Sequence, residues 1–361
     1  MNVIDLFCGC GGFSCGFAMA GFNTVLGIDM WNDAIVTFLR NHPDAKAINE
    51  DITKVSADEL LKVAGKEAAE IDVIIGGPPC QGFSISGKRL IDDPRNKLYK
   101  SFVDIVSYIQ PKVFVMENVP GLISMGNGAV KAQVVEDFEK AGYIVETKVL
   151  TASDYGVPQS RRRVFFVGIN PRKILNTERF AFPEPTHGDA FFLQPYVTCE
   201  DALSDLDFVS ETEVLPEEID YQMPPKTEYQ RMMRENSPKL HNHSITIHTQ
   251  KTRSIIAMVP DGGNYKSLPK ELWQTRKVHI AWTRMNSKKP CFTIDTGHNH
   301  HFHYHANRVP TVRESARLQS FPDSYEFIGI KTSQLKQVGN AVPPLLAKAI
   351  AEEVGKVIIR G

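Results

Sequence analysis

The alternation of short apolar runs with helical patterns through the first 170 residues constrains the fold most strongly. The runs predict strands at residues 2–7, 24–28, 72–75, 112–116, 143–150 and 164–169. Helical spacing of apolar residues predicts helices at 11–20, 34–40, 98–109 and 130–140. Because strands joined through helices pair in parallel with right-handed crossovers, the pattern predicts an α/β fold, with a parallel Rossmann-like sheet covered by helices on both faces.

The pattern changes after Asn170-Pro171, which suggests a second domain. Residues 198–220 hold nine acids and no Lys or Arg, as in a boundary or an exposed linker. Residues 221–310 are irregular, and a helical pattern returns at 345–359, just after Pro343 and Pro344. We therefore expect one domain of residues 1–170, completed by 331–361, and a smaller irregular domain of residues 171–330.

The charge of the chain is unevenly distributed. The net charge is −1, yet residues 226–310 carry nine more basic than acidic side chains and nine of the eleven histidines. A basic segment in an otherwise acidic chain suggests a surface that binds a polyanion. A solvated basic face would have the same composition, so charge alone leaves both interpretations open.

Cysteine usage and hydropathy point to an intracellular protein. The six cysteines are scattered, and the first residues lack the basic segment of a signal peptide, so a disulfide framework is not expected. Cys8, Cys10 and Cys15 form no CxxC pair, which favours buried packing residues over metal ligands. No apolar run reaches the roughly 20 residues of a membrane span, so we expect a cytoplasmic protein.

A glycine turn follows the first predicted strand. Gly9, Gly11 and Gly12 stand where that strand meets a helix, so a ligand could approach the backbone beside a helix N-terminus. Asp29 ends the second strand and could accept hydrogen bonds from ribose hydroxyls. The turn is not GxGxxG, which disfavours a dinucleotide, and a glycine turn needed only for packing remains an alternative.

Two further segments follow buried strands and carry reactive groups. Cys80 comes after Gly76-Gly77-Pro78-Pro79, at the strand end where α/β proteins place active sites, and a thiolate is a good nucleophile. The alternative is a structural thiol. Glu117 ends the next strand, where it could act on a substrate or cap the following turn. Arg161 and Arg163, just before the last strand, could clamp a carbonyl or a phosphate, or lie on a basic surface turn.

Taken in order, these segments resemble the cytosine-C5 DNA methyltransferases of prokaryotic restriction–modification systems. The resemblance covers most of the chain and rests on eight segments, which are Asp5-Leu6-Phe7 with the glycine turn, Asp29, Asp51-Ile52, 78–81, 117–119, Gln159 with Arg161 and Arg163, 313–322 and 337–343. No single segment decides the assignment, but eight in the same order do.

The resemblance implies S-adenosylmethionine as methyl donor and no metal. It implies that Cys80 attacks carbon 6 of a cytosine, that Glu117 binds its N3, and that Arg163, helped by Arg161, holds its O2. The cofactor residues that it implies are Phe7, Gly9, Gly11, Gly12, Asp29, Met30, Asp51, Ile52, Pro78, Leu98, Asn340 and Val342. An aromatic residue often follows the ribose acid, whereas here Met30 does and Trp31 comes next, so which side chain meets the adenine stays open.

The implied substrate is double-stranded DNA with a flipped-out cytosine. By the resemblance, residues 81–97 form a loop over the flipped base, with Gln81, Ser84, Ser86, Lys88 and Arg89 near the DNA. Residues 171–330 become the target-recognition domain. A cognate restriction endonuclease is a candidate partner, and we expect a monomer in the bacterial cytoplasm or nucleoid.

Three alternatives remain at this stage. The same chemistry could act on tRNA, the chain could be a catalytically inactive DNA-binding homologue, or the glycine turn could hold NAD or FAD. The run of histidines from His298 to His305 also permits a zinc site, although DNA-facing or packing histidines are favoured because no cysteine pair accompanies them.

Overall fold

The computed structural model describes residues 1–79, 97–175, 179–208, 211–273, 282–296 and 301–360. The chain divides into two compact units. Unit 1 comprises Met1–Thr151, Arg162–Glu184 and Pro344–Gly361, and unit 2 comprises Ala152–Arg161 and Pro185–Pro343. The division therefore differs from the expected boundaries, because residues 171–184 belong to unit 1 and residues 152–161 and 331–343 to unit 2.

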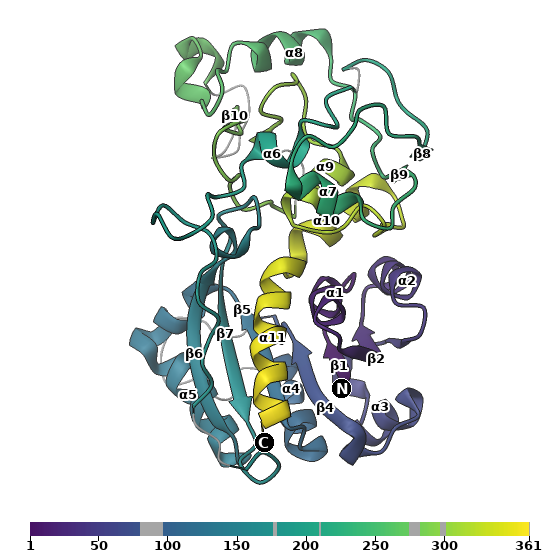
Figure 1. The fold of residues 1–361 in the computed structure, drawn as a ribbon, viewed down its shortest axis with the longest axis vertical. Coiled ribbons are helices and arrows are strands. Elements are labelled where there is room, and N and C mark those ends of the chain that lie inside the picture. The colour runs from purple at the N-terminus through teal and green to yellow at the C-terminus, as the bar shows by residue number, and fades with distance from the viewer. Residues whose placement is uncertain (80–96, 176–178, 209–210, 274–281, 297–300, 361) are drawn as a thin grey trace. The chain divides into compact units, whose positions relative to one another are not determined.

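Unit 1 is built on a seven-stranded sheet (Figure 1). The strands are β1 (Asn2–Leu6), β2 (Asn23–Asp29), β3 (Lys46–Asn49), β4 (Ile71–Gly76), β5 (Val113–Asn118), β6 (Ile144–Thr151) and β7 (Arg162–Ile169). Their order is β3-β2-β1-β4-β5-β7-β6. The sequence predicted six of these strands and missed β3, a partly exposed strand of four residues.

The expectation of a wholly parallel sheet was wrong for one strand. The pairs among β1 to β5 are parallel, whereas β7 runs antiparallel to both β5 and β6. A parallel neighbour needs a long crossover connection, usually a helix. Only residues 152–161 join β6 to β7, with the short η5 (Ala152–Tyr155) among them, so β7 turns back between β5 and β6.

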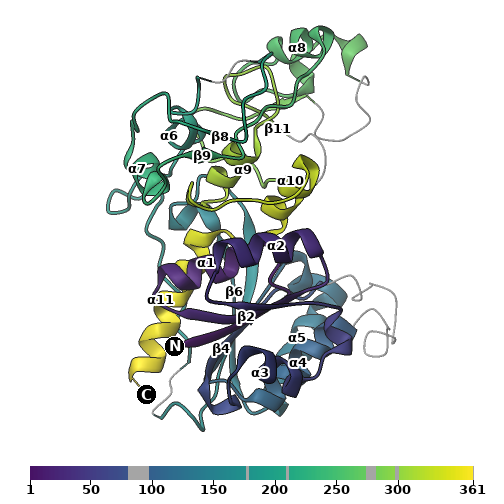
Figure 2. The ribbon, with the colours of Figure 1, turned by 90° about the vertical axis from the view of Figure 1, so that its right-hand side faces the viewer.

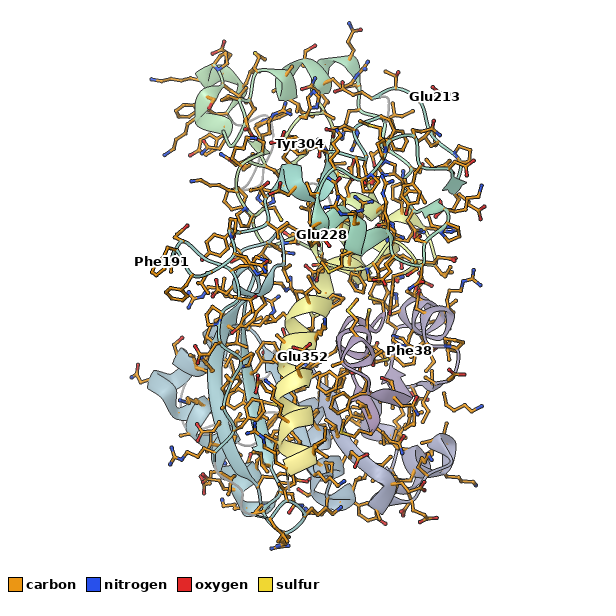
Figure 3. All side chains as sticks on the ribbon, in the orientation of Figure 1. Phe38, Phe191, Glu213, Glu228, Tyr304 and Glu352 are labelled. Carbon is orange, nitrogen blue, oxygen red and sulfur yellow. The ribbon has the colours of Figure 1, made fainter. Side chains whose placement is uncertain are left out.

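Helices cover both faces of the sheet, as the alternation predicted (Figure 2). The helices of unit 1 are α1 (Gly12–Met19), α2 (Asn32–Asn41), α3 (Ala57–Ala64), α4 (Lys97–Ile109), α5 (Ala129–Lys140) and α11 (Pro344–Arg360). The sequence analysis did not predict α3. Under α3, α4 and α5 lies the largest apolar core, in which the rings of Phe114 and Phe138 stack at 3.9 Å and Phe102 packs edge-on against both. On α2, Phe38 is fully buried (Figure 3).

On α1, Gly16 allows an unusually close approach to α11. A Cβ at position 16 would lie 2.4 Å from Ala347 Cβ, 2.4 Å from Pro344 O and 2.7 Å from Lys348 N. These distances are far below those between non-bonded atoms in contact. Two of the three atoms belong to the backbone of α11, so a change of side-chain rotamer could not relieve the overlap. The absence of a side chain at this position therefore sets the α1–α11 packing distance.

Unit 2 contains little regular structure. Its helices are α6 (Cys199–Leu203), α7 (Glu228–Arg234), α8 (Gln250–Ala257), α9 (Val312–Leu318) and α10 (Lys331–Asn340). Within its described residues, β8 (Glu218–Ile219) pairs with β9 (Leu240–His241) and β10 (Thr283–Arg284) pairs with β11 (His301–Phe302). Phe191 projects from a turn of this unit into solvent (Figure 3). Among the described helices of both units, none combines the length and apolar character that a bilayer span requires.

Buried arginines organise unit 2. Arg317 is fully buried and forms a two-pronged ion pair with Asp323, with distances of 2.9 and 2.6 Å, and a further pair with Asp205. Arg308 pairs in the same way with the buried Glu314, at 2.7 and 2.6 Å. Buried charges persist only when they are paired and hydrogen-bonded. Residues 308–323 thus form a charged core for the unit.

Two buried histidines adjoin this charged core. The Nδ1 atom of His303 accepts hydrogen bonds from the backbone N–H groups of His305, at 3.1 Å, and Ala306, at 3.0 Å. Burial lowers the pKa of His303 to about 3 and that of His243 to about 4, although both face the Glu314 carboxylate. These two hydrogen bonds hold residues 303–306 in a turn. Because Nδ1 of His303 accepts both, a second proton on the ring, which would bind Nδ1, would break the turn.

Replacing Gly16 by alanine is predicted to destabilise unit 1 by about 1–3 kcal/mol or more, because α11 must move away from α1. Urea unfolding followed by circular dichroism measures the effect. The matched control is Gly355→Ala within α11, where an added Cβ has its nearest neighbour at 3.7 Å. This control should be neutral or stabilising by up to about 1 kcal/mol, and equal losses in both variants would contradict the packing argument.

The buried histidines predict acid sensitivity. In the unfolded chain His303 takes up a proton near pH 6.5, whereas the buried ring of the folded protein stays neutral down to about pH 3. The free energy of unfolding therefore falls by about 1.4 kcal/mol per pH unit for each such histidine as the pH drops from about 6.5 towards 3. His303→Asn keeps an acceptor for the turn and should reduce the loss between pH 6.5 and 5.0 by about 2 kcal/mol. Urea unfolding followed by tryptophan fluorescence tests this, since Trp273 and Trp282 lie in unit 2.

The control for this experiment is His305→Asn, whose side chain is 72% exposed in the native protein. It should keep the pH dependence of the unchanged chain. An unaltered slope in the His303 variant would show that another group governs the acid transition.

Candidate active site

The sequence-predicted site residues of unit 1 gather at one edge of the sheet, where the parallel strands β1, β2, β4 and β5 end. On one side of β1 the strands β2 and β3 follow, and on its other side lie β4 and β5. The direction in which consecutive strands are added to the sheet therefore reverses between β1 and β4. In open α/β sheets, ligands bind outside the carboxyl ends of strands at such a switch point. The topology therefore puts the glycine turn and the segment before Cys80 side by side.

The glycine turn has a strongly left-handed backbone. Phe7, Gly9 and Gly11 have φ values of +61°, +52° and +93°, and α1 begins at Gly12. An added Cβ at Gly9 would meet no atom within 4 Å, so open space lies beside the backbone at this point. A turn of this kind can bring main-chain groups next to a ligand.

Asp29 braces the same turn from the end of β2. One carboxylate oxygen accepts from Gly9 N and the other from Trp31 N, both at 2.9 Å. Burial raises the pKa of Asp29, while these backbone hydrogen bonds oppose the rise. The acid is thus held in place at the strand end, where a ribose hydroxyl could reach it. Its neighbour Met30 is 71% exposed.

The remaining cofactor candidates are spread over both units. Asp51 accepts from Thr53 N at 3.0 Å, Ile52 is buried, and Leu98 is half-buried at the start of α4. These three lie in unit 1 with Pro78. Asn340, which is exposed, and Val342, which is buried, belong to unit 2. Each unit by itself therefore presents only part of the predicted set.

Asn118 fixes the backbone that leads to the candidate nucleophile. Its side chain is buried at the end of β5, donates to Pro78 O at 2.9 Å and accepts from Val119 N at 2.9 Å. Pro78 stands two residues before Cys80. The sequence analysis gave Asn118 no role, although its position directly after Glu117 in the strand-end segment was the available signal.

Glu117 and Arg163 form an ion pair at the same edge. Arg163 Nε lies 2.7 Å from Glu117 Oε1, and their side chains are 15% and 13% exposed. The register of β5 with β7 pairs Asn118 with Val164, which brings Arg163 to the end of β5. A Cβ at Gly77 would lie 3.0 Å from Glu117 Oε2, so the glycine leaves room for the carboxylate.

Two groups of predicted residues lie outside the described part of unit 1. Arg161 is buried and belongs to unit 2, whereas Arg163 belongs to unit 1. Cys80, Gln81, Ser84, Ser86, Lys88 and Arg89 lie outside the described residues.

The site also contains Asp5, which the sequence analysis named as part of the first segment but gave no role of its own. Asp5 is buried on β1 and accepts a hydrogen bond from Ser14 Oγ at 2.6 Å. Burial raises the pKa of this carboxyl to about 7. The contact joins β1 to the first turn of α1 and so helps to hold the glycine turn. Cys8, Cys10 and Cys15 are buried, as predicted.

The histidine-rich run is largely occupied by packing in its described part. His301 stacks on Phe292 at 4.8 Å, His303 is buried against Tyr304, and the His305 side chain is 72% exposed. His298 and His300 lie outside the described residues. Across the part of the chain that the structure describes, no group of three or more His, Cys, Asp or Glu side chains is arranged to hold a metal ion.

The mixed seven-stranded sheet and the strand-end site define the class of S-adenosylmethionine-dependent methyltransferases. Residues 1–356 match the family model of C-5 cytosine-specific DNA methylases. The chain belongs to this family and is an S-adenosylmethionine-dependent DNA cytosine-C5 methyltransferase of the restriction–modification type.

Several relatives are similar to this chain over nearly its whole length. It is 41% identical to Type II methyltransferase M.DdeI of Desulfomicrobium norvegicum, over 98% of this chain and 88% of the relative, and 41% identical to Type II methyltransferase M1.HphI of Haemophilus parahaemolyticus, over 99% and 87%. A crystal structure of a prophage-encoded chain of E. coli, assigned as a DNA modification methyltransferase, matches with TM-score 0.81 and 28% identity over 99% of both chains. The S. pombe Dnmt2 methyltransferase shares the fold, with TM-score 0.58 and 17% identity over 99% and 98%.

Replacing Asn118 by alanine is predicted to slow methyl transfer by about 10- to 100-fold, because the backbone of Pro78, two residues before the candidate nucleophile Cys80, loses its hydrogen bond. Methyl incorporation into duplex DNA under single-turnover conditions measures the step. The control is Asn170→Ala, which removes a buried amide at the opposite end of β7. Similar rates for the two variants would show that the Asn118 contact serves stability alone.

Proposed function

We propose that the protein methylates cytosine through a transient covalent bond between Cys80 and carbon 6 of the base. The observation that carries this proposal is the ion pair of Glu117 with Arg163 beside the Asn118–Pro78 contact. A carboxylate, a guanidinium group and the backbone of Pro78, two residues before Cys80, thus lie at the same edge of the sheet. The chain in which they lie belongs to the C-5 cytosine-specific DNA methylase family.

In the proposed reaction, the Cys80 thiolate forms a bond to C6, and the electron pair of the C5–C6 double bond moves to C5. Glu117, which takes up a proton when Arg163 turns from it to O2, donates this proton in a hydrogen bond to N3, where negative charge would otherwise develop, and Arg163 holds O2. Preorganised groups of this kind contribute several kcal/mol of transition-state stabilisation in a site that excludes water. Carbon 5 then accepts the methyl group, the methyl–sulfonium bond breaks and leaves S-adenosylhomocysteine, a base removes the C5 proton, and the bond from the Cys80 sulfur to C6 breaks.

The Glu117–Arg163 ion pair would be exchanged for contacts with the base. With no base bound, the two side chains neutralise each other at 2.7 Å. A cytosine offers Arg163 its carbonyl oxygen and Glu117 its ring nitrogen, so each side chain finds a new partner. Arg161 would stabilise the arginine segment from unit 2.

Residues of the glycine turn fit an S-adenosylmethionine molecule. Bound S-adenosylmethionine supplies an electrophilic methyl group on a sulfonium sulfur. Asp29 is held so that its oxygens can accept from ribose hydroxyls, and the space beside Gly9 admits a ligand close to the backbone. Phe7, Gly11, Gly12, Met30, Asp51, Ile52, Pro78, Leu98, Asn340 and Val342 complete the proposed set.

For the substrate, we propose a cytosine flipped out of duplex DNA. Residues 81–97, with Gln81, Ser84, Ser86, Lys88 and Arg89, would cover the flipped base. Unit 2 would read the sequence, since residues 226–310 carry the excess of basic side chains that phosphate contacts need. A monomer acting in the bacterial cytoplasm, beside an endonuclease of the same specificity, completes the proposal.

A mechanism-based trap tests the covalent route. A duplex with 5-fluorocytosine at the target position should become linked to the protein when S-adenosylmethionine is added, because fluorine cannot leave C5 as a proton would. The target position is found first by bisulfite sequencing of DNA from cells that express the protein. Denaturing gel electrophoresis and peptide mass spectrometry should locate the adduct on Cys80.

Two controls complete the experiment. Cys80→Ala should form no adduct and incorporate no methyl groups, yet still bind the duplex. A tRNA preparation replaces the duplex in a parallel reaction, where no methyl incorporation is expected. A Cys80→Ala protein that methylates DNA at the normal rate would overturn the covalent route.

A further inference from the structure

In unit 2, Gln159 connects three segments through one buried side chain. Its amide is completely buried and uses both ends. The Oε1 atom accepts from Ile294 N at 2.9 Å, while Nε2 donates to Leu318 O at 3.1 Å and to the side-chain oxygen of Gln319. Because an N–H group points at Oε1 and two oxygens face Nε2, the amide has only one orientation that satisfies every partner.

The backbone around Gln159 is joined to the same segment as its side chain. Gln159 and Cys291 form a parallel bridge, in which Cys291 N donates to Pro158 O and Ser160 N donates to Cys291 O, both at 2.9 Å. The side-chain contact to Ile294 N extends this pairing by three residues. Residues 291–294 are thus fastened to the chain two residues before Arg161 and four before Arg163.

On its other side, the 291–296 segment is held by α10. A Cβ at Gly339 would lie 2.6 Å from Asp295 O and 3.0 Å from Thr296 N, so the helix meets this backbone without space between them. Gln319 extends the network, since its Nε2 donates to Ala341 O at 2.6 Å. Residues 291–296 are therefore held between residues 158–160, which directly precede the arginine segment, and the end of α10.

We propose that Gln159 is a positioning residue that couples the 291–296 segment, in the unit that reads DNA, to the arginine segment 161–163. Binding of the correct DNA sequence to unit 2 then fixes the position of the backbone that carries Arg163. From this position the side chain of Arg163 holds the base. The inference rests on the proposed function, because it assigns base holding to Arg163 and sequence reading to unit 2. It predicts that Gln159 controls the chemical step and its sequence selectivity rather than the affinity for DNA.

Gln230 offers a matched control. Its side chain is also completely buried in unit 2, where Nε2 donates to Asp201 O at 2.8 Å and Ser204 Oγ at 3.0 Å, and Oε1 accepts from Lys226 N. It lies on α7, and none of these partners belongs to the segments around Gln159. A methionine in place of either glutamine keeps the side-chain volume and removes three side-chain hydrogen bonds in each case. The two variants should therefore lose similar amounts of stability.

The experiment compares Gln159→Met with Gln230→Met in the full-length protein, on the duplex identified by bisulfite sequencing and on a duplex with one altered recognition base pair. For Gln159→Met we expect kcat on the correct duplex to fall about 10- to 100-fold, KM for DNA to change less than about twofold, and the ratio of rates on the two duplexes to shrink. The rate of adduct formation with the 5-fluorocytosine duplex should fall in parallel. Gln230→Met should keep all four values near those of the unchanged protein.

Gln159→Glu keeps the inference testable if the methionine variant does not fold. Because the site is buried and Leu318 O and Gln319 Oε1 face this side chain, the new carboxyl group stays protonated, accepts from Ile294 N and donates to one of the two oxygens, so kcat should stay within about fivefold of the unchanged protein. Equal kcat for Gln159→Met and Gln230→Met, or a loss confined to KM, would overturn the coupling. The unchanged protein in the same assay tests the proposed function separately, because its own failure to form the adduct would reject the covalent route regardless of Gln159.

Discussion

The parallel pairing of β4 with β5 is the interaction on which the site depends. Their register pairs Gly76 with Met116, so the chain after each strand emerges at the same sheet edge. This ladder lets Asn118 reach Pro78, 40 positions earlier in the chain, and it puts Gly77 against Glu117. The antiparallel β7 then brings Arg163 to the same edge. Three distant segments thus meet because backbone hydrogen bonds fix their strands, before any side chain contributes.

Unit 2 is held together by a different kind of interaction. Its strands are only two residues long, so backbone ladders cannot order it. Instead, Arg308, Arg313 and Arg317 are buried among acids and main-chain carbonyls. A paired buried charge adds little net stability compared with an apolar group, but it tolerates few alternative arrangements. A polar core of this kind suits the role proposed for unit 2, in which irregular chain segments hold side chains in fixed positions.

Local patterns predicted most elements of unit 1, because apolar periodicity reflects which face of a strand or helix is buried. The direction of β7 could not be predicted in this way, since its sequence suits either orientation and the short link from β6 decides it. Residues 313–322 were matched to a family segment, yet nothing in their polar composition indicates that Arg313 and Arg317 are fully buried. The contacts of Asn118 and Gln159 were also hidden, because an amide gains a specific role only from partners distant in the chain.

The sequence by itself determined the α/β class, the order of the motifs and the chemistry of the candidate groups, since thiol, carboxylate and guanidinium have their properties wherever they lie. It also determined the family, because eight segments follow one another in a shared order. Only the tertiary structure decided that Glu117 pairs with Arg163, that Asn118 donates to Pro78, and that the buried Gln159 accepts from Ile294 N. These contacts join residues 40 to 135 positions apart. Their geometry follows from strand register and burial, which are properties of the whole chain rather than of any local segment.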